Sequence, residues 1–121
     1  MSYPAGTGGG GITGAAKLLG TSGAVTWDPN TNPVGAIIIT NHVTSITATA
    51  PVADNKMCWL ILVGDGSHTW PTSVGNAALV GGTFTGPAGN GSVSILSFFG
   101  TSTLPGGAQW KQYCATAAAV S

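Results

Sequence analysis

The sequence predicts an all-β protein, an antiparallel and jelly-roll-like β-sandwich that follows a glycine-rich extended arm. Short runs of β-branched and aromatic residues recur along the chain and are separated by Gly, Pro, Asn and Asp, as in strands joined by tight turns. No window of about a dozen residues carries the 3.6-residue period of an amphipathic helix. These two observations together favour strands throughout.

The first 22 residues form the predicted arm, and residues 23–121 form the predicted β domain. Residues 8–11 are four glycines in a row, and such a run is costly in backbone entropy to order. We therefore expect the arm to become ordered against a partner. Its candidate contact residues are Ile12, Leu18 and Leu19.

The strongest strand signal is the apolar run at residues 57–63, which predicts a central strand. Turn residues at 28–30, 53–55, 64–66, 89–91 and 105–107 separate the candidate strands. The other strong candidates are residues 34–40, 43–49, 92–99 and 109–114, and the weaker ones are residues 24–27, 68–70 and 78–84.

The chain has four tryptophans, and all of them fall in or beside predicted strands. Aromatic rings supply much buried area, so packing in the core or at a subunit interface is the predicted role. Stacking on a sugar ring is the alternative, with Trp70 and Asn76 as the candidate contacts. The candidate interface residues are Trp27, Trp70 and Trp110.

Only six residues carry a formal charge, three lysines and three acids. A compact domain of this size shows water roughly 6,000 Å² of surface, and ordinary domains are about one-quarter charged residues. A nearly uncharged surface tends to associate, so we expect other subunits of a large assembly to cover much of it. The neutral balance argues against nucleic acid and against an anionic membrane as partners, because both require a basic surface.

No run of about eighteen apolar residues is present, and no positively charged segment precedes an apolar one at the start. We expect no membrane span and no secretion signal, and we expect folding in a cytosol that keeps thiols reduced. Cys58 and Cys114 are then predicted to be buried free thiols, with a disulfide between neighbouring strands as the alternative. A disulfide would instead fit a secreted carbohydrate-binding or adhesin domain.

The polar residues offer little chemistry. His42 falls in a predicted turn, and His68 follows Asp65 and Ser67, but neighbouring residues on a strand point to opposite faces and do not converge. The histidines and cysteines lack the paired spacing of a zinc site, and Asp65 alone does not make a calcium site. Lys17 is not followed by Ser or Thr, so the glycines before it do not form a phosphate-binding loop. The sequence predicts no catalytic residue, no metal and no cofactor, and therefore not an enzyme.

Four segments carry a resemblance to a known family. Residues 46–51 read Ile-Thr-Ala-Thr-Ala-Pro, and residues 59–71 run from an apolar strand through Gly-Asp-Gly to Thr-Trp-Pro. Residues 93–99 and 110–115 then supply a second apolar strand and a closing aromatic strand. In this order, over residues 35–115, they resemble a small β domain that recurs in bacteriophage tail fibres and related virion proteins.

The resemblance implies a homotrimeric, non-enzymatic β-sandwich on a phage particle, assembled in the host cytoplasm. The chain departs from the family at residues 74–77, where Val-Gly-Asn-Ala replaces a frequent Lys-Trp-Pro-Gly-Gly loop, and in lacking the long rod of fibres. The missing rod favours a capsid decoration (cement) protein that binds the major capsid protein or another virion protein and stabilises the shell. The alternative is a tail-fibre or tail-tip module that binds a receptor glycan.

Overall fold

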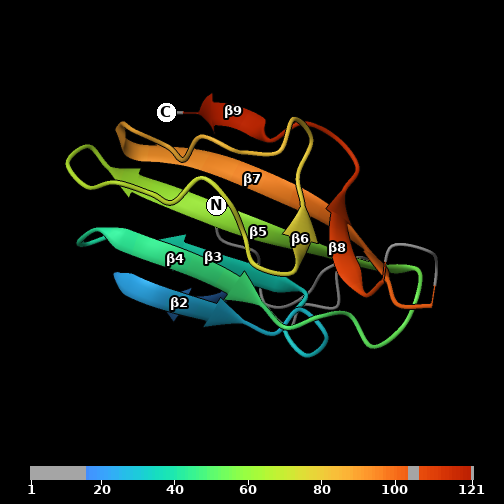
Figure 1. The fold of residues 1–121 in the computed structure, drawn as a ribbon. Helices are drawn as coiled ribbons and strands as arrows, with labels where there is room; N and C mark the ends of the chain where they lie inside the picture. Colours follow the sequence, from blue (N-terminus) through green and yellow to red (C-terminus); the bar gives the residue numbers. More distant parts are fainter. Residues whose placement is uncertain (1–15, 104–106, 121) are drawn as a thin grey trace, which may run out of the picture.

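The structure is a computed structural model that describes residues 16–103 and 107–120, and its regular elements are all β (Figure 1). Within those residues there are nine strands and no helix, which confirms the all-β prediction. In chain order the strands are β1 (Lys17–Gly20), β2 (Gly23–Trp27), β3 (Val34–Ile38), β4 (Val43–Ala48), β5 (Lys56–Asp65), β6 (Ala77–Ala78), β7 (Asn90–Thr101), β8 (Gln109–Gln112) and β9 (Ala117–Val120).

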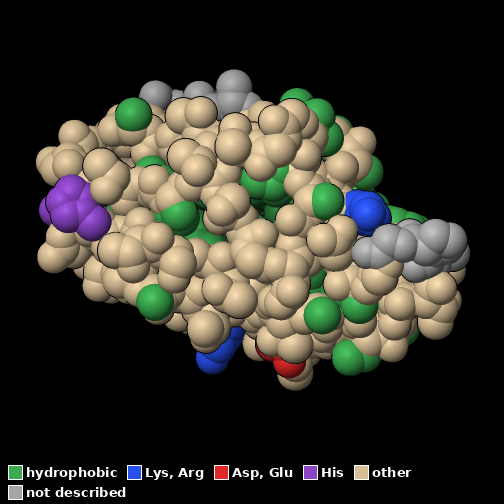
Figure 2. Space-filling model, in the orientation of Figure 1, with side chains coloured by type: hydrophobic (Ala, Val, Ile, Leu, Met, Phe, Trp, Pro, Cys, Tyr) green, Lys and Arg blue, Asp and Glu red, His purple; other side chains and the backbone are tan. Residues whose placement is uncertain are grey.

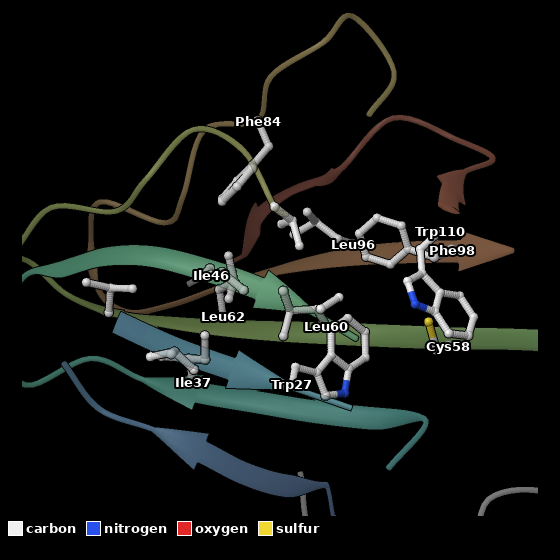
Figure 3. Packing of buried hydrophobic residues seen from close by; sticks show 14 of the residues in the cluster. Trp27, Ile37, Ile46, Cys58, Leu60, Leu62, Phe84, Leu96, Phe98 and Trp110 are labelled. Carbon is white, nitrogen blue, oxygen red and sulfur yellow. The ribbon is translucent and has the colours of Figure 1, made fainter. Parts of the chain in front are cut away.

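The strands form a large sheet and a small sheet. The large sheet has the order β1-β3-β5-β7-β8-β6, and β9 also pairs with β7; the small sheet is the pair β2-β4. In Figure 1 the small sheet lies in front of β3. Buried side chains of both sheets belong to one hydrophobic cluster (Figure 3). The two sheets therefore pack face to face around a single core.

The pairing in the first half of the chain differs from the predicted antiparallel order. Strand β1 pairs with β3, β3 with β5, and β2 with β4, all in parallel, as do β6 and β8. Antiparallel pairs join β7 to β5, β8 and β9. A jelly roll, whose neighbours are antiparallel, does not describe the segment from β1 to β5. The prediction is wrong here because an alternating pattern specifies which face is buried but not which way the partner strand runs.

The small sheet continues beyond its two strands. Gly75 forms a parallel bridge with Thr47, and its backbone N–H donates to the Ile46 carbonyl at 2.8 Å. This pairing places Val74 beside Ile46, which in turn lies opposite Val25 of β2. All three side chains are buried, so they form a ladder of apolar residues along the inner side of the small sheet.

Trp27 and Trp110 lie in the hydrophobic core. Their side chains are 1% and 0% exposed. Trp27 Nε1 donates to the Asn32 carbonyl and Trp110 Nε1 to the Thr49 carbonyl, each at 2.7 Å, so neither buried N–H is left unpaired. The Trp27 ring also packs against the Phe98 ring, with 6.0 Å between the two ring centroids. Of the two roles predicted for these tryptophans, packing in the core is the one that the structure shows.

Part of the predicted arm belongs to the large sheet. Residues 17–20 form β1 at the sheet edge, where Leu19 packs against the core and Leu18 is 51% exposed. The boundary predicted between residues 22 and 23 therefore falls after the first strand has joined the sheet. Ile12 and the rest of the arm to residue 15 lie outside the described residues.

Most predicted strands correspond to observed ones. Residues 24–27, 34–40, 43–49, 57–63, 92–99 and 109–114 match β2, β3, β4, β5, β7 and β8, with ends that differ by a few residues. Residues 68–70 are not a strand, and only the start of residues 78–84 is in β6.

Candidate functional site

Two of the three carboxylates in the chain close loops. Asp28 accepts hydrogen bonds from the Thr31 hydroxyl at 2.8 Å and the Asn30 backbone N–H at 3.1 Å. Asp54 accepts one of 2.6 Å from the Ser102 backbone N–H, which lies 48 positions further along the chain. These bonds, led by Thr31 for Asp28 and by Ser102 for Asp54, hold the pKa of each carboxyl below its usual value. Both carboxylates therefore stabilise the loops in which they lie.

The third carboxylate, Asp65, pairs with His68, contrary to the sequence prediction. Strand β5 ends at Asp65, and the next residues turn, with Gly66 at a φ of 83°. Asp65 Oδ1 accepts the backbone N–H groups of Ser67 and His68, both at 3.0 Å, and this turn brings His68 Nδ1 to 2.5 Å from Asp65 Oδ2. The His68 hydrogen bond is the main reason that the pKa of Asp65 falls to about 2. The prediction failed because it applied the alternation of a strand to Asp65, Ser67 and His68, although it also placed a turn at residues 64–66.

His42, from the turn between β3 and β4, lies beside this pair. Its Nδ1 accepts the Thr69 backbone N–H at 3.0 Å, and its ring lies edge-on to that of His68 with centroids 5.0 Å apart. Figure 2 shows the two histidines as one patch at the end of the molecule. Among the described residues no three His, Cys, Asp or Glu side chains form a group that could hold a metal ion. The His42–Thr69 contact joins the two loops at this end.

A hollow of about 290 Å³ opens next to the histidine patch. Its lining includes His68, Trp70, Thr72 and Thr85, which supply an imidazole, an indole and two hydroxyls. The Trp70 ring is held in place, because its Nε1 donates to the Pro87 carbonyl at 2.9 Å. Unlike the two core tryptophans, Trp70 is only half-buried. The hollow therefore offers an oriented aromatic ring at the surface.

Asn76, the second predicted sugar contact, does not line this hollow. Its side-chain amide donates to the Ala48 carbonyl at 2.8 Å, and its backbone carbonyl accepts the backbone N–H of Trp110 at 2.9 Å. The structure thus does not bring Trp70 and Asn76 together around one ligand. Asn76 instead links the end of β4 to the start of β8.

The two cysteines are free and occupy different environments. Cys58 is buried on β5, and burial raises the pKa of its thiol to about 12. Cys114 is exposed, because β8 ends two residues before it. The prediction of a buried free thiol is confirmed for Cys58 and wrong for Cys114, and the alternative disulfide is not formed.

The large sheet is apolar on both faces. Across β3, β5 and β7, the side chains that point away from the core fall into rows set by the strand register, such as Ala36–Ile61–Ile95 and Ile38–Val63–Val93. We call this surface the outer face. Its residues are Leu18, Val34, Ala36, Ile38, Met57, Trp59, Ile61, Val63, Val93, Ile95, Ser97 and Phe99.

The small sheet shows the opposite character on its own outward side. Its outward residues are small or hydroxylated: Ala24, Thr26, Thr44, Ser45 and Thr47. Figure 2 views the molecule from this side, and polar uncharged side chains and backbone dominate the surface there. Alternation of apolar and polar residues is typical of a sheet with one solvent-exposed face. Strands that are apolar on both faces are typical of a sheet that is covered on both sides.

The sequence carried a signal for the outer face that its interpretation did not use. Residues 57–63 are apolar without interruption, and residues 36–39 are likewise apolar. A strand without polar residues is apolar on both faces, which the strand prediction alone does not state. Of the candidate interface residues with described positions, Leu18 lies on the outer face, whereas Leu19, Trp27, Trp70 and Trp110 do not.

No family model, curated protein or solved structure matches this chain. Across residues 16–103 and 107–120, no helix has the length and apolar character needed to cross a membrane. Function is therefore inferred from the outer face, the loop-closing carboxylates and the hollow beside Trp70.

Proposed function

We propose that this protein is a non-enzymatic structural component of a large assembly, held there by apolar contact. The outer face is the observation that carries the proposal. Monomeric soluble proteins rarely expose a contiguous apolar patch larger than a few hundred Å², and larger patches mark interaction sites. A chain with only six charges has few other means of keeping such a face in solution.

The size of the outer face is sufficient for a stable contact. Four strands spaced at about 4.8 Å and followed over about eight residues at 3.3 Å cover about 500 Å². At about 25 cal/mol per Å², burying that area gives a gross gain of about 12 kcal/mol per copy before the costs of association. Even if only a small part of this free energy remained after those costs, the sum over many binding sites would stabilise a large shell.

The use of the carboxylates supports the non-enzymatic part of the proposal. General acid–base chemistry requires a titratable group within hydrogen-bond reach of a substrate. Asp28, Asp54 and Asp65 each accept hydrogen bonds from neighbouring loop residues instead.

The specific role that we propose is a homotrimeric capsid decoration protein of a bacteriophage particle, bound to the major capsid protein. Its support is the resemblance of residues 35–115 to small β domains of virion proteins. The most specific part of that resemblance, residues 59–71, forms most of β5, the Asp65 turn and part of the lining of the hollow at Trp70. We describe the domain accordingly as a mixed two-layer β-sandwich.

The test is to locate the protein on purified particles. Immunogold microscopy and mass spectrometry of separated heads and tails should find it on heads, and shells stripped of it should regain heat resistance when it is added back. Detection on tails alone would overturn the decoration role.

A tail module that binds a receptor glycan is the second candidate, and the hollow beside Trp70 favours it. An indole ring in a hollow that Thr72 and Thr85 also line suits a sugar, whose apolar face stacks and whose hydroxyls form hydrogen bonds. Binding on a glycan array that Trp70→Phe weakens and that a matched change at the exposed Val80 leaves intact would support this candidate. An array without a signal for the wild-type protein would refute it.

A further inference from the structure

We propose that the outer face is the contact surface between copies of this chain, which pack outer face to outer face around a symmetry axis. The inference rests on the proposed function and names the partner within it. Its starting point is the register: Ile61 and Ile95 lie opposite each other at the centre of the sheet, with Ala36 on the other side of Ile61. The centre of the face is thus a flat apolar row that spans three strands.

The inner face of the same sheet shows what such a surface packs against. Leu60 and Leu96 are paired across β5 and β7 in the same register and are fully buried against the small sheet. The neighbouring residues on the outer face are equally apolar, yet Ile95 is 38% exposed and Ile38 is 48% exposed. The strands are therefore built for a covered surface on both sides, and the described chain covers one.

The charges explain why a second copy fits. Lys111 lies beside Phe99 at one end of the face, and Lys17 and Lys56 begin the strands β1 and β5 at its margin. Asp65 ends β5 just beyond Val63 at the margin of the face, and its carboxylate is bound by His68 Nδ1 and by the backbone N–H groups of Ser67 and His68. Two such faces can meet without burying an unpaired charge, and copies with a net charge of zero do not repel each other.

The area also suits contact between copies. About 500 Å² from each of two copies gives about 1,000 Å² in total, which is the lower bound for a specific interface. Sheets stack face to face at about 10 Å when flat side chains such as Val and Ile interdigitate. Loops at the rim would add to the contact if three copies met around one axis.

The experiment compares lysine substitutions on and off the outer face. Ile38→Lys and Ile95→Lys place a charge on it at side chains that are 48% and 38% exposed, and Val80→Lys is the control, at a side chain that is 49% exposed and off the face. Native mass is measured by light scattering after size exclusion over a range of protein concentrations. We expect an oligomer for the wild type and for Val80→Lys. The dissociation constant should rise at least about tenfold for the two face variants, because each must bury a charge in the interface.

A second measurement covers the case in which a lysine variant does not fold. In a Cys114→Ser background, Ile95→Cys should form an intermolecular disulfide under mild oxidation, and Val80→Cys should not. A wild-type monomer at all concentrations, or face variants that assemble like the wild type, would overturn the inference. So would a monomer whose outer face becomes open to hydroxyl-radical footprinting only after deletion of residues 1–15, because the chain's own N-terminal residues would then be the occupant.

Different experimental results would overturn the contact surface and the proposed virion role. An oligomer broken by Ile38→Lys but unable to bind any phage particle would keep the contact surface and overturn the virion role. A monomer that binds shells would do the reverse. A dimer in place of a trimer would keep the outer face as the contact and overturn only the predicted trimer.

Discussion

Replacing Trp110 with Phe changes one buried ring and one buried hydrogen bond. The side chain is fully buried, and its Nε1 donates to the Thr49 carbonyl at 2.7 Å. Loss of that hydrogen bond costs about 1 kcal/mol. The smaller ring leaves a void of roughly 40 Å³, which costs about another 1 kcal/mol. We expect Trp110→Phe to lower the free energy of unfolding by about 2 kcal/mol without changing the native mass.

The assay is urea denaturation followed by far-UV circular dichroism at one fixed protomer concentration, because assembly shifts the midpoint. With a slope of about 2 kcal/mol per molar urea, the midpoint should fall by about 1 M. Val52→Ala, at a side chain that is 72% exposed, is the control and should stay within about 0.5 kcal/mol of the wild type. A Trp110→Phe protein with the wild-type midpoint and a lost oligomer would refute the core placement and restore the interface role.

Three further predictions follow from the loops and the thiols. Because its hydrogen bonds lower the pKa of Asp65 to about 2, the carboxylate contributes stability above its unfolded pKa of about 4, and that contribution is lost as the pH falls towards 2. Thermal midpoints should therefore fall across this range, and fall less in Asp65→Asn; parallel pH profiles would contradict the assignment. In Gly86→Ala the new Cβ would lie 2.3 Å from Trp70 Cγ, so the thermal midpoint should drop and the tryptophan fluorescence should shift, whereas unchanged values for both would show that the ring is not held there. Finally, a thiol reagent at neutral pH should label Cys114 and spare Cys58 in the native protein and label both in urea, and rapid native labelling of Cys58 would contradict its burial.

The strands were predictable because each of them keeps its own pattern. The apolar run at residues 57–63 lies within β5, and the run at residues 92–99 lies within β7. The direction of their partners was not predictable, because a residue such as Ile37 is buried equally well whether its neighbour Leu62 belongs to a parallel or an antiparallel strand. The parallel pairs are thus a property of the connections and not of the strands.

The residues at the loop end were harder to place for a different reason. Asp65 and His68 meet because Gly66 adopts a positive φ and the Asp65 side chain accepts two backbone N–H groups, and both contacts are local geometry that a strand pattern does not contain. The positions of the tryptophans were also hard to predict from the residues around them. The Trp110 indole N–H donates to a carbonyl inside the core, whereas the Trp70 indole N–H donates to a carbonyl beside the hollow. Those acceptors come from Thr49 and Pro87, far away in the sequence.

The alternation of β1 to β5 between the two sheets has a consequence for the order of folding. No two consecutive strands in this half pair with each other, so no local hairpin can form there. The segments between the paired strands are residues 21–33, 28–42 and 39–55, which are 13, 15 and 17 residues long. Each pairing must therefore close a loop several times longer than a hairpin turn. The antiparallel pair of β5 and β7 is joined over its whole length and provides the longest template in the molecule. During synthesis β1 to β4 leave the ribosome before this template exists. We expect β1 to β4 to remain without stable pairing until β7 is complete. Strand β3 should then pair with β5, and β1 should pair with β3 afterwards.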